Sequence, residues 1–182
     1  MINIDIVGNG ASSRLWTRTD RPWIQCNIPH NQGTPDFAII IDRQPITWMH
    51  ENNYKLTCPI YGTKRANDLQ KQYKLDLDFH QEWINPQDSG FMNSGQAAVI
   101  KFADECEQIH LWGFDSMYQS ITNSLMDDKV KRIRNSSLKK QWDIWWNRIF
   151  IKYPKQQFFV YGKDSVELQG DYGQNVHYRT VD

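Results

Sequence analysis

Five consecutive apolar residues, Phe37-Ala38-Ile39-Ile40-Ile41, constrain the fold of this chain more than any other segment. A strand with one face in water alternates apolar and polar side chains, whereas a strand covered on both faces can be apolar throughout. Strands covered in this way are typical of parallel sheets, because helical connections lie on both faces. The run therefore predicts a buried strand in an α/β protein.

Short β-rich runs and helical segments alternate along the rest of the chain. Further strands are predicted at residues 2–7, 23–26, 56–60, 108–112 and 157–161, and helices at residues 63–73, 94–106 and 138–151. This alternation favours a sheet with a substantial parallel part. We predict a single Rossmann-like α/β domain over residues 1–161, with a mainly parallel sheet flanked by helices. The polar segment 162–182 is expected to form a C-terminal hairpin or arm, and 182 residues fit one domain.

Composition narrows the class of protein. The 21 Lys and Arg residues balance 21 Asp and Glu residues, which argues against a uniformly basic nucleic-acid-binding protein but allows a local basic patch. No apolar run approaches the roughly 20 residues of a membrane-spanning helix, and the N-terminus lacks the basic and apolar regions of a signal peptide. Three widely spaced cysteines, Cys26, Cys58 and Cys106, indicate a reduced cytoplasmic protein and not a disulfide scaffold.

Three segments combine small and polar residues at the ends of predicted elements. Gly8-Asn9-Gly10-Ala11-Ser12-Ser13 follows the first strand, and its small residues let a phosphate approach backbone N–H groups. Ser94-Gly95 begins a predicted helix, where Ser94 can act as the N-cap. Gly113-Phe114-Asp115 follows strand 108–112, at the edge where α/β sheets bind ligands. Each segment alone also suits an ordinary turn or helix cap, but three on one edge favour a joint site.

Ile6-Val7-Gly8-Asn9-Gly10-Ala11-Ser12 resembles the N-terminal G-N-G-P-S segment of bacterial sialyltransferases, and Gln25-Cys26-Asn27 resembles the R-C-N segment that follows it. Asn93-Ser94-Gly95 is similar to their S-G helix start, and Glu107–Asp115 to their strand ending in G-x-D. The last stretch is also similar to the small sialyl motif of animal sialyltransferases. A related Rossmann-like group, the archaeal hydroxymethylpterin diphosphokinases, shares much of this pattern. The resemblance therefore implies a nucleotide site more firmly than it implies sialyl transfer.

The resemblance also implies a role for each matched residue. Gly8, Asn9, Gly10 and Ser12 would hold the nucleotide phosphate and sugar, and Asn27 would bind the donor. Ser94 and Gly95 would hold the cytidine or ribose. Gly113, Phe114 and Asp115 would flank the base. Asp42 stands where the family often has an Asn that contacts the donor, and this change places a carboxylate beside an anionic ligand.

The catalytic groups of the family are matched less well. Bacterial members stabilise the leaving phosphate with two tyrosines after the G-x-D segment, and here Tyr118 is placed for one of them. They also supply a general-base His from a lid, whereas the corresponding residues 116–137 contain no His. His177 lies five residues before Asp182, a spacing similar to the H-x-x-x-x-E motif that holds the catalytic His of animal sialyltransferases. His177 is therefore the candidate base, and a surface tail histidine is the alternative.

Neither a metal site nor a nucleic-acid site is predicted. Asp76-Leu77-Asp78 matches the D-x-D motif of another glycosyltransferase fold, where carboxylates bind a divalent ion. Apolar residues alternate with these carboxylates, so the favoured interpretation is an exposed strand face. Sialyl donors carry a monophosphate, and the resemblance requires no metal. The basic residues between 129 and 140 are interpreted as a solvated helix face or loop, with a lid that meets an anionic donor or acceptor as the alternative.

The sequence thus predicts a sialyltransferase-like glycosyltransferase that binds a CMP-sugar and transfers the sugar with inversion to an acceptor such as a glycan. No cofactor is expected beyond the nucleotide-sugar donor, and residues 116–137 would form a lid over it. Two alternatives stay open. One is a non-catalytic nucleotide-binding module of the same fold. The other is a pterin or nucleotide diphosphokinase, which would need acidic metal ligands near the phosphate.

Overall fold

The computed structural model describes residues 2–29, 33–82, 92–119, 125, 137–163, 168 and 172–181. Within these residues one eight-stranded sheet forms, and every pair of neighbouring strands in it is parallel. The strands are β1 Ile2–Val7, β2 Trp23–Cys26, β3 Phe37–Ile40, β4 Ile60–Gly62, β5 Phe79–Gln81, β6 Cys106–Trp112, β7 Gln157–Gly162 and β8 Val176–Thr180. This sheet confirms the predicted Rossmann-like α/β fold.

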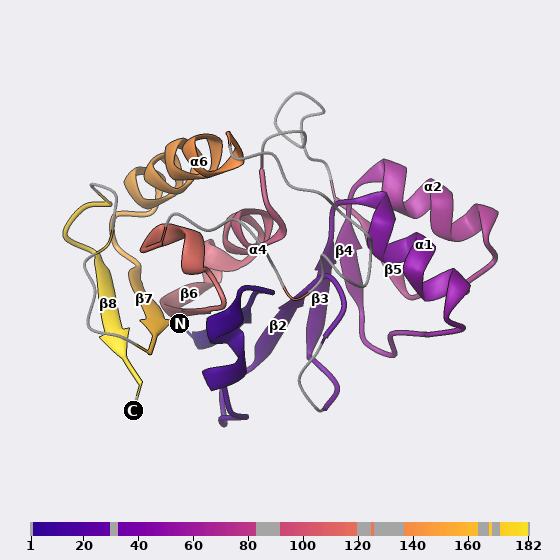
Figure 1. Cartoon of the computed structure of the whole chain (residues 1–182), viewed down its shortest axis with the longest axis horizontal. Coiled ribbons are helices and arrows are strands. Elements are labelled where there is room, and N and C mark those ends of the chain that lie inside the picture. The colour runs from indigo at the N-terminus through magenta and orange to yellow at the C-terminus, as the bar shows by residue number, and fades with distance from the viewer. Residues whose placement is uncertain are drawn as a thin grey trace.

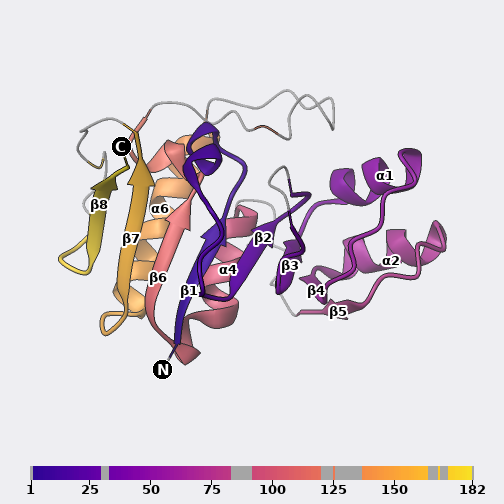
Figure 2. The ribbon, with the colours of Figure 1, turned by 90° about the horizontal axis from the view of Figure 1, so that it is seen from below.

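The strand order β5-β4-β3-β2-β1-β6-β7-β8 places β1 inside the sheet, as Figure 2 shows. The chain runs outward from β1 to β5 on one side and then returns to build β6, β7 and β8 on the other side. The connections that leave β1 and β6 therefore diverge at the carboxyl edge of the sheet. Such a reversal is the topological switch point at which open α/β sheets bind ligands.

Two pairs of helices cover opposite faces of the sheet. They are α1 Arg43–Glu51, α2 Lys64–Gln72, α4 Ser94–Phe102 and α6 Leu138–Lys152. Ile39 of β3 packs in the core formed with α4 and α6, whereas its neighbours Ala38 and Ile40 pack in the core formed with α1 and α2. Figure 1 shows α1 and α2 at the end of the molecule opposite β7 and β8. On the second face, β1 and β6 are covered by the 3-10 helix η1 (Ala11–Leu15) and the loop after it. No described helix has the length and apolar character needed to cross a membrane.

The helix predicted at 94–106 ends at Phe102, and Cys106 begins β6. Three other segments also differ from the sequence prediction. β4 begins at Ile60, the last residue of the strand expected at 56–60. β8 pairs parallel to β7 and extends the sheet, so the two strands do not form a hairpin. A parallel pair requires the chain to return from the carboxyl end of β7 to the level of its amino end before β8 begins. The 13 residues between the strands, 163–175, are long enough for this connection. Asp76 and Asp78 precede β5 instead of lying on it, and Asp76 pairs with Lys55 at 3.2 Å.

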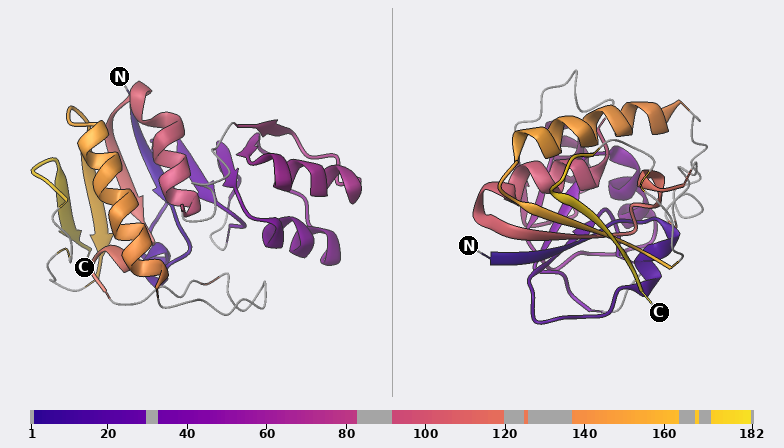
Figure 3. Two further views of the ribbon diagram at one scale, coloured as in Figure 1. Left: turned by 90° about the horizontal axis from the view of Figure 1, so that it is seen from above. Right: turned by 90° about the vertical axis from the view of Figure 1, so that its left-hand side faces the viewer.

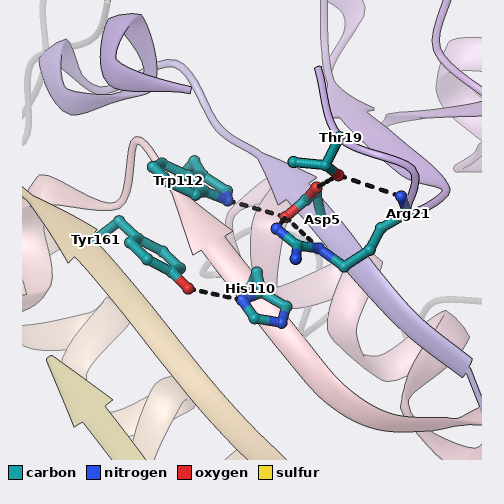
Figure 4. Close-up of polar contacts among 6 residues, drawn as sticks. All are labelled: Asp5, Thr19, Arg21, His110, Trp112 and Tyr161. Carbon is teal, nitrogen blue, oxygen red and sulfur yellow. Dashed lines mark hydrogen bonds and ion pairs between the residues drawn. The ribbon is translucent and has the colours of Figure 1, made fainter. Parts of the chain in front are cut away.

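A buried carboxylate on β1 ties the loop after η1 to the sheet (Figure 4). Asp5 is 0% exposed, and its Oδ1 accepts hydrogen bonds from Arg21 Nε at 3.2 Å, Arg21 Nη2 at 3.0 Å and Trp112 Nε1 at 3.0 Å. Its Oδ2 accepts a hydrogen bond from Thr19 Oγ1 at 2.7 Å. A buried charge is tolerated only when it is paired and hydrogen-bonded, and these contacts meet that need. They fix the chain that connects the glycine-rich turn to β2.

His110 lies beside this network on β6. Its Nδ1 is 2.8 Å from the hydroxyl of Tyr161 on β7, and its ring stacks on Phe159 with 5.1 Å between centroids. Burial, assisted by the Arg21 cation, lowers the pKa of His110 to about 4, against a smaller opposite effect of Asp5. The imidazole is therefore uncharged at neutral pH, and its Nδ1 can accept the Tyr161 hydroxyl hydrogen.

We predict that His110 makes the protein less stable in acid. The unfolded chain protonates a histidine near pH 6.5, whereas folded His110 is protonated only near pH 4. Titration of His110 therefore leaves the free energy of unfolding unchanged above pH 6.5. As the pH falls toward 4, the free energy of unfolding decreases by about 3 kcal/mol in total. Urea unfolding at neutral and acidic pH measures this loss. His110→Gln does not titrate and should lose less stability than the wild type over the same range, and equal losses would contradict the prediction.

Candidate functional site

The turns that follow β1 and β6 lie against each other at the switch point. Gly8 N–H donates to the Trp112 carbonyl at 2.6 Å, and Gly10 N–H donates to the Gly113 carbonyl at 2.9 Å. The pairing of β1 with β6 thus continues beyond the end of both strands. The structure therefore places the turn expected to hold phosphate beside the turn expected to flank the base.

Gly10 permits this close approach. A Cβ at position 10 would collide with the Asp115 carboxylate and lie 2.6 Å from the Gly113 carbonyl oxygen. Both groups belong to the neighbouring turn, so packing between the two turns requires a glycine here. The glycine-rich sequence thus has a structural explanation alongside the ligand-binding one.

Asp115, which is 7% exposed, links the turn after β6 to the turn after β1 through hydrogen bonds. Its carboxylate accepts a 3.1 Å hydrogen bond from Ser12 N–H and a 3.0 Å hydrogen bond from the Ser12 hydroxyl. The Tyr118 hydroxyl lies 3.0 Å from Asp115 Oδ1 and 3.3 Å from the Tyr161 carbonyl. Burial raises the pKa of Tyr118, and the Asp115 carboxylate contributes to the rise. Asp115 therefore joins the two turns, and Tyr118 links Asp115 to β7.

Phe114 fills the space between the turn after β6 and the start of α4. It is 6% exposed and meets the Trp146 ring of α6 edge to face, with 5.5 Å between centroids. A Cβ at Gly95 would collide with the Phe114 ring, so the glycine lets the start of α4 approach the switch point. Phe114 is a core side chain in this arrangement.

Hydrogen bonds connect the ends of β1 and β2 with the start of α4. Asn27 has a φ of 61°, in the left-handed region that Asn tolerates better than most residues, and its Oδ1 accepts a 3.1 Å hydrogen bond from Ser94 Oγ. Asn9 Nδ2 donates at 2.5 Å to the carbonyl of Cys26, the residue before Asn27. The fold thus brings together three residues expected to bind the nucleotide.

The N-cap of α4 is Asn93, and the prediction that Ser94 caps this helix is wrong. Asn93 Oδ1 accepts from Gln96 N–H at 2.9 Å, and Gln96 Oε1 accepts from Asn93 N–H at 2.9 Å, which forms a capping box. The Ser94 hydroxyl bonds Asn27 instead. Since Ser94 and Gly95 occupy the first turn, their N–H groups have no acceptor within the helix. The N-x-x-Q spacing of residues 93–96 is the sequence signal for this motif.

Asp42 lies at the N-terminus of α1, after β3. Its Oδ1 is 3.1 Å from Arg65 Nη2, and Arg65 Nε donates to the Ile41 carbonyl at 3.1 Å. The Arg65 cation therefore offsets the negative charge that Asp42 brings to this edge of the sheet.

His177 is not brought to the switch point. It lies on β8, where its Nε2 is 2.8 Å from Gln157 Oε1 and its ring centroid is 5.3 Å from that of Phe159. The register aligns His177 with Phe159, His110 and Asp5 across four neighbouring strands. This places it about 14 Å from β1 at the usual strand spacing. These side chains face away from α4, whose core contains Phe158 instead.

The expected lid is described only in part. Residues 116–119, 125 and 137 belong to the described part of the chain, and Leu125 N–H donates to the Asn9 carbonyl at 2.6 Å. Leu125 therefore contacts the turn after β1. Of the basic residues noted between 129 and 140, those before 137 lie outside the described residues, whereas Lys139 and Lys140 belong to α6.

Within the described ranges, no group of three or more His, Cys, Asp and Glu side chains is placed to hold a metal ion. Comparison with known proteins finds no matching family model, no matching curated protein and no matching solved structure. The functional interpretation therefore depends on the geometry of this edge of the sheet and on the residue pattern of the chain.

We predict that Gly95→Ala destabilises the protein through Phe114. The added Cβ has no space beside the ring, and such overpacking costs about 1–3 kcal/mol. The higher helix propensity of alanine offsets up to about 1 kcal/mol of this. Chemical unfolding measures the change. Gly95→Ala combined with Phe114→Leu should cost less than the sum of the two single changes, because leucine makes room, and additive effects would contradict the contact.

Proposed function

We propose that the protein binds a CMP-sugar at the β1–β6 switch point and acts as a sialyltransferase-like glycosyltransferase that transfers the sugar with inversion. The contact between Asn27 and Ser94 carries this proposal. These residues are 67 positions apart, and both match donor-binding positions of the family that the sequence resembles. Their hydrogen bond lies at the edge of the sheet where α/β proteins bind ligands.

The groups at this edge suit a nucleotide monophosphate. The amide side chains of Asn9 and Asn27 carry both donors and acceptors of the kind that bind a ribose or a base. The first N–H groups of α4, at Ser94 and Gly95, and the positive end of the helix dipole favour an anion. Phosphate and cytidine would therefore find complementary groups on neighbouring elements.

Inverting transfer needs a base that removes the proton of the acceptor hydroxyl while its oxygen attacks the sugar and CMP leaves. Of the two candidate catalytic residues, Tyr118 bonds to the buried Asp115, and His177 of β8 bonds Gln157 of β7. This observation favours, as a second candidate, a nucleotide-binding module of the same fold without catalysis. A diphosphokinase is favoured less, because Asp42 and Asp115 are engaged with protein partners.

Asn27→Gly should weaken CMP binding and leave the fold intact, because glycine accepts the left-handed backbone of residue 27 without strain. CMP at 100 times its Kd should stabilise the wild type by about 2.7 kcal/mol, and the variant by clearly less at the same concentration. A thermal-shift titration measures both. Asn53→Gly is the matched control, since Asn53 is exposed and also has a positive φ, of 49°. No stabilisation of the wild type by CMP would exclude a cytidine donor.

Turnover separates the enzyme from the binding module. Release or transfer of sialic acid from CMP-sialic acid by the wild type is the result expected of the enzyme, whereas CMP binding without release would indicate the module. If His177 is the base, His177→Ala abolishes release and keeps the CMP response. Unchanged release would remove His177 from the mechanism.

A further inference from the structure

The outer face of α6 carries large apolar side chains in contact with solvent. Ile144 and Ile151 are 47% and 74% exposed, whereas Trp146, Ile149 and Phe150 on the inner face are at most 2% exposed. Ile144 and Ile151 are seven residues apart, or two helical turns, so they share one side of the helix. The right-hand view of Figure 3 shows α6 along the outside of the molecule.

Cations accompany the two isoleucines. Lys140, Arg148 and Lys152 are all exposed on α6, and Lys140 and Arg148 lie one turn before and one turn after Ile144. The Arg148 guanidinium carbon lies 5.2 Å from the centroid of the Trp145 ring, which is only partly buried. The outer face thus combines aliphatic, aromatic and cationic groups.

Two sets of acidic residues in the described part of the chain lie near α6. The acid of α6, Asp143, is 2.8 Å from Lys139 Nζ and accepts a 2.9 Å hydrogen bond from Tyr172. Asp104 and Glu105 follow α4, and the contact of Gln156 with the Ala103 carbonyl places that segment beyond the C-terminal end of α6. Among the residues of α6 itself, the outer face therefore carries three exposed cations, whereas the one acid, Asp143, is paired with Lys139.

We propose that the outer face of α6 docks the protein onto the anionic surface of a phospholipid bilayer. The helix would lie in the plane of the membrane, with Ile144 and Ile151 at the boundary of the acyl chains and Lys140, Arg148 and Lys152 at the lipid phosphates. The backbone of a nucleic acid would pair with the cations but leave both isoleucines in water. The interface of an anionic bilayer accommodates both kinds of side chain. This docking is independent of the proposed nucleotide site.

Flotation with phosphatidylcholine vesicles, prepared with and without phosphatidylserine, tests the proposal. We expect the wild type to float with the phosphatidylserine vesicles and to be released by salt, because salt screens the cations. The Ile144→Ser/Ile151→Ser variant should lose about tenfold or more in its partition coefficient, since neither serine buries apolar surface. Lys140→Gln/Arg148→Gln should bind more weakly and depend less on salt.

Exposed residues elsewhere provide matched controls. Ile2→Ser removes a 49% exposed isoleucine from β1, and Lys71→Gln removes an exposed cation from α2. Both variants should float like the wild type. The proposal is overturned by absence of flotation, by equal binding to phosphatidylcholine alone, or by unchanged binding of the Ile144→Ser/Ile151→Ser variant. Sedimentation provides a further test, because a wild-type dimer that this variant dissociates, without vesicle binding, would assign the face to a second copy.

Discussion

The contact between the turns after β1 and β6 determines how the two halves of the sheet meet. Gly8 and Gly10 extend the backbone pairing of these strands, and the Asp115 carboxylate binds Ser12 across the gap. β1 and β6 lie in the interior of the sheet, and the strands on either side of them depend on their alignment. A side chain at position 10 would displace the carboxylate, so the alignment depends on a residue that contributes only its backbone.

This contact also divides the roles among the residues of the candidate site. The Asp115 carboxylate bonds to Ser12 and to Tyr118, so these residues hold the turn after β6 against the turn after β1. Asn27 and Ser94 lie at the ends of their elements and join β2 to α4. Supporting and ligand-binding roles thus fall on different residues within segments that the sequence alone groups together. Asn27 and Ser94, together with Asn9 and the Gly95 N–H, are the groups proposed to contact the CMP-sugar.

The sheet was predictable because its strands differ from their surroundings in local composition. The apolar run Phe37–Ile41 indicated burial on both faces, and most of it forms β3. The direction of β8 was not predictable, since strand propensity reports how well residues fit a pleated, half-buried surface and does not specify the direction of the partner strand. The long connection before Val176 was the only indication of a parallel return.

The site was predictable as a set of segments but not as a set of contacts. Asn93 and Ser94 are both good N-caps, and the capping box of Asn93 with Gln96 leaves the Ser94 hydroxyl to bond Asn27, a residue 67 positions away. The pairing of Asp42 with Arg65 joins residues from different helix starts and has no local sequence signal. The position of His177 within β8 directs its side chain away from α4, which a spacing to the chain end cannot show.

The strand order has a consequence for the ribosome-bound chain. β1 is made first, but one of its two neighbours is β6, and Ile4 must wait for Ile109 to pair. Until Cys106–Trp112 has been synthesised, β1 forms the edge of an incomplete sheet and presents unpaired N–H and C=O groups along an apolar strand. Such edges add strands from other molecules. A partial sheet formed between the completion of β5 and the emergence of β6 would therefore expose the edge of β1 to strands of other molecules.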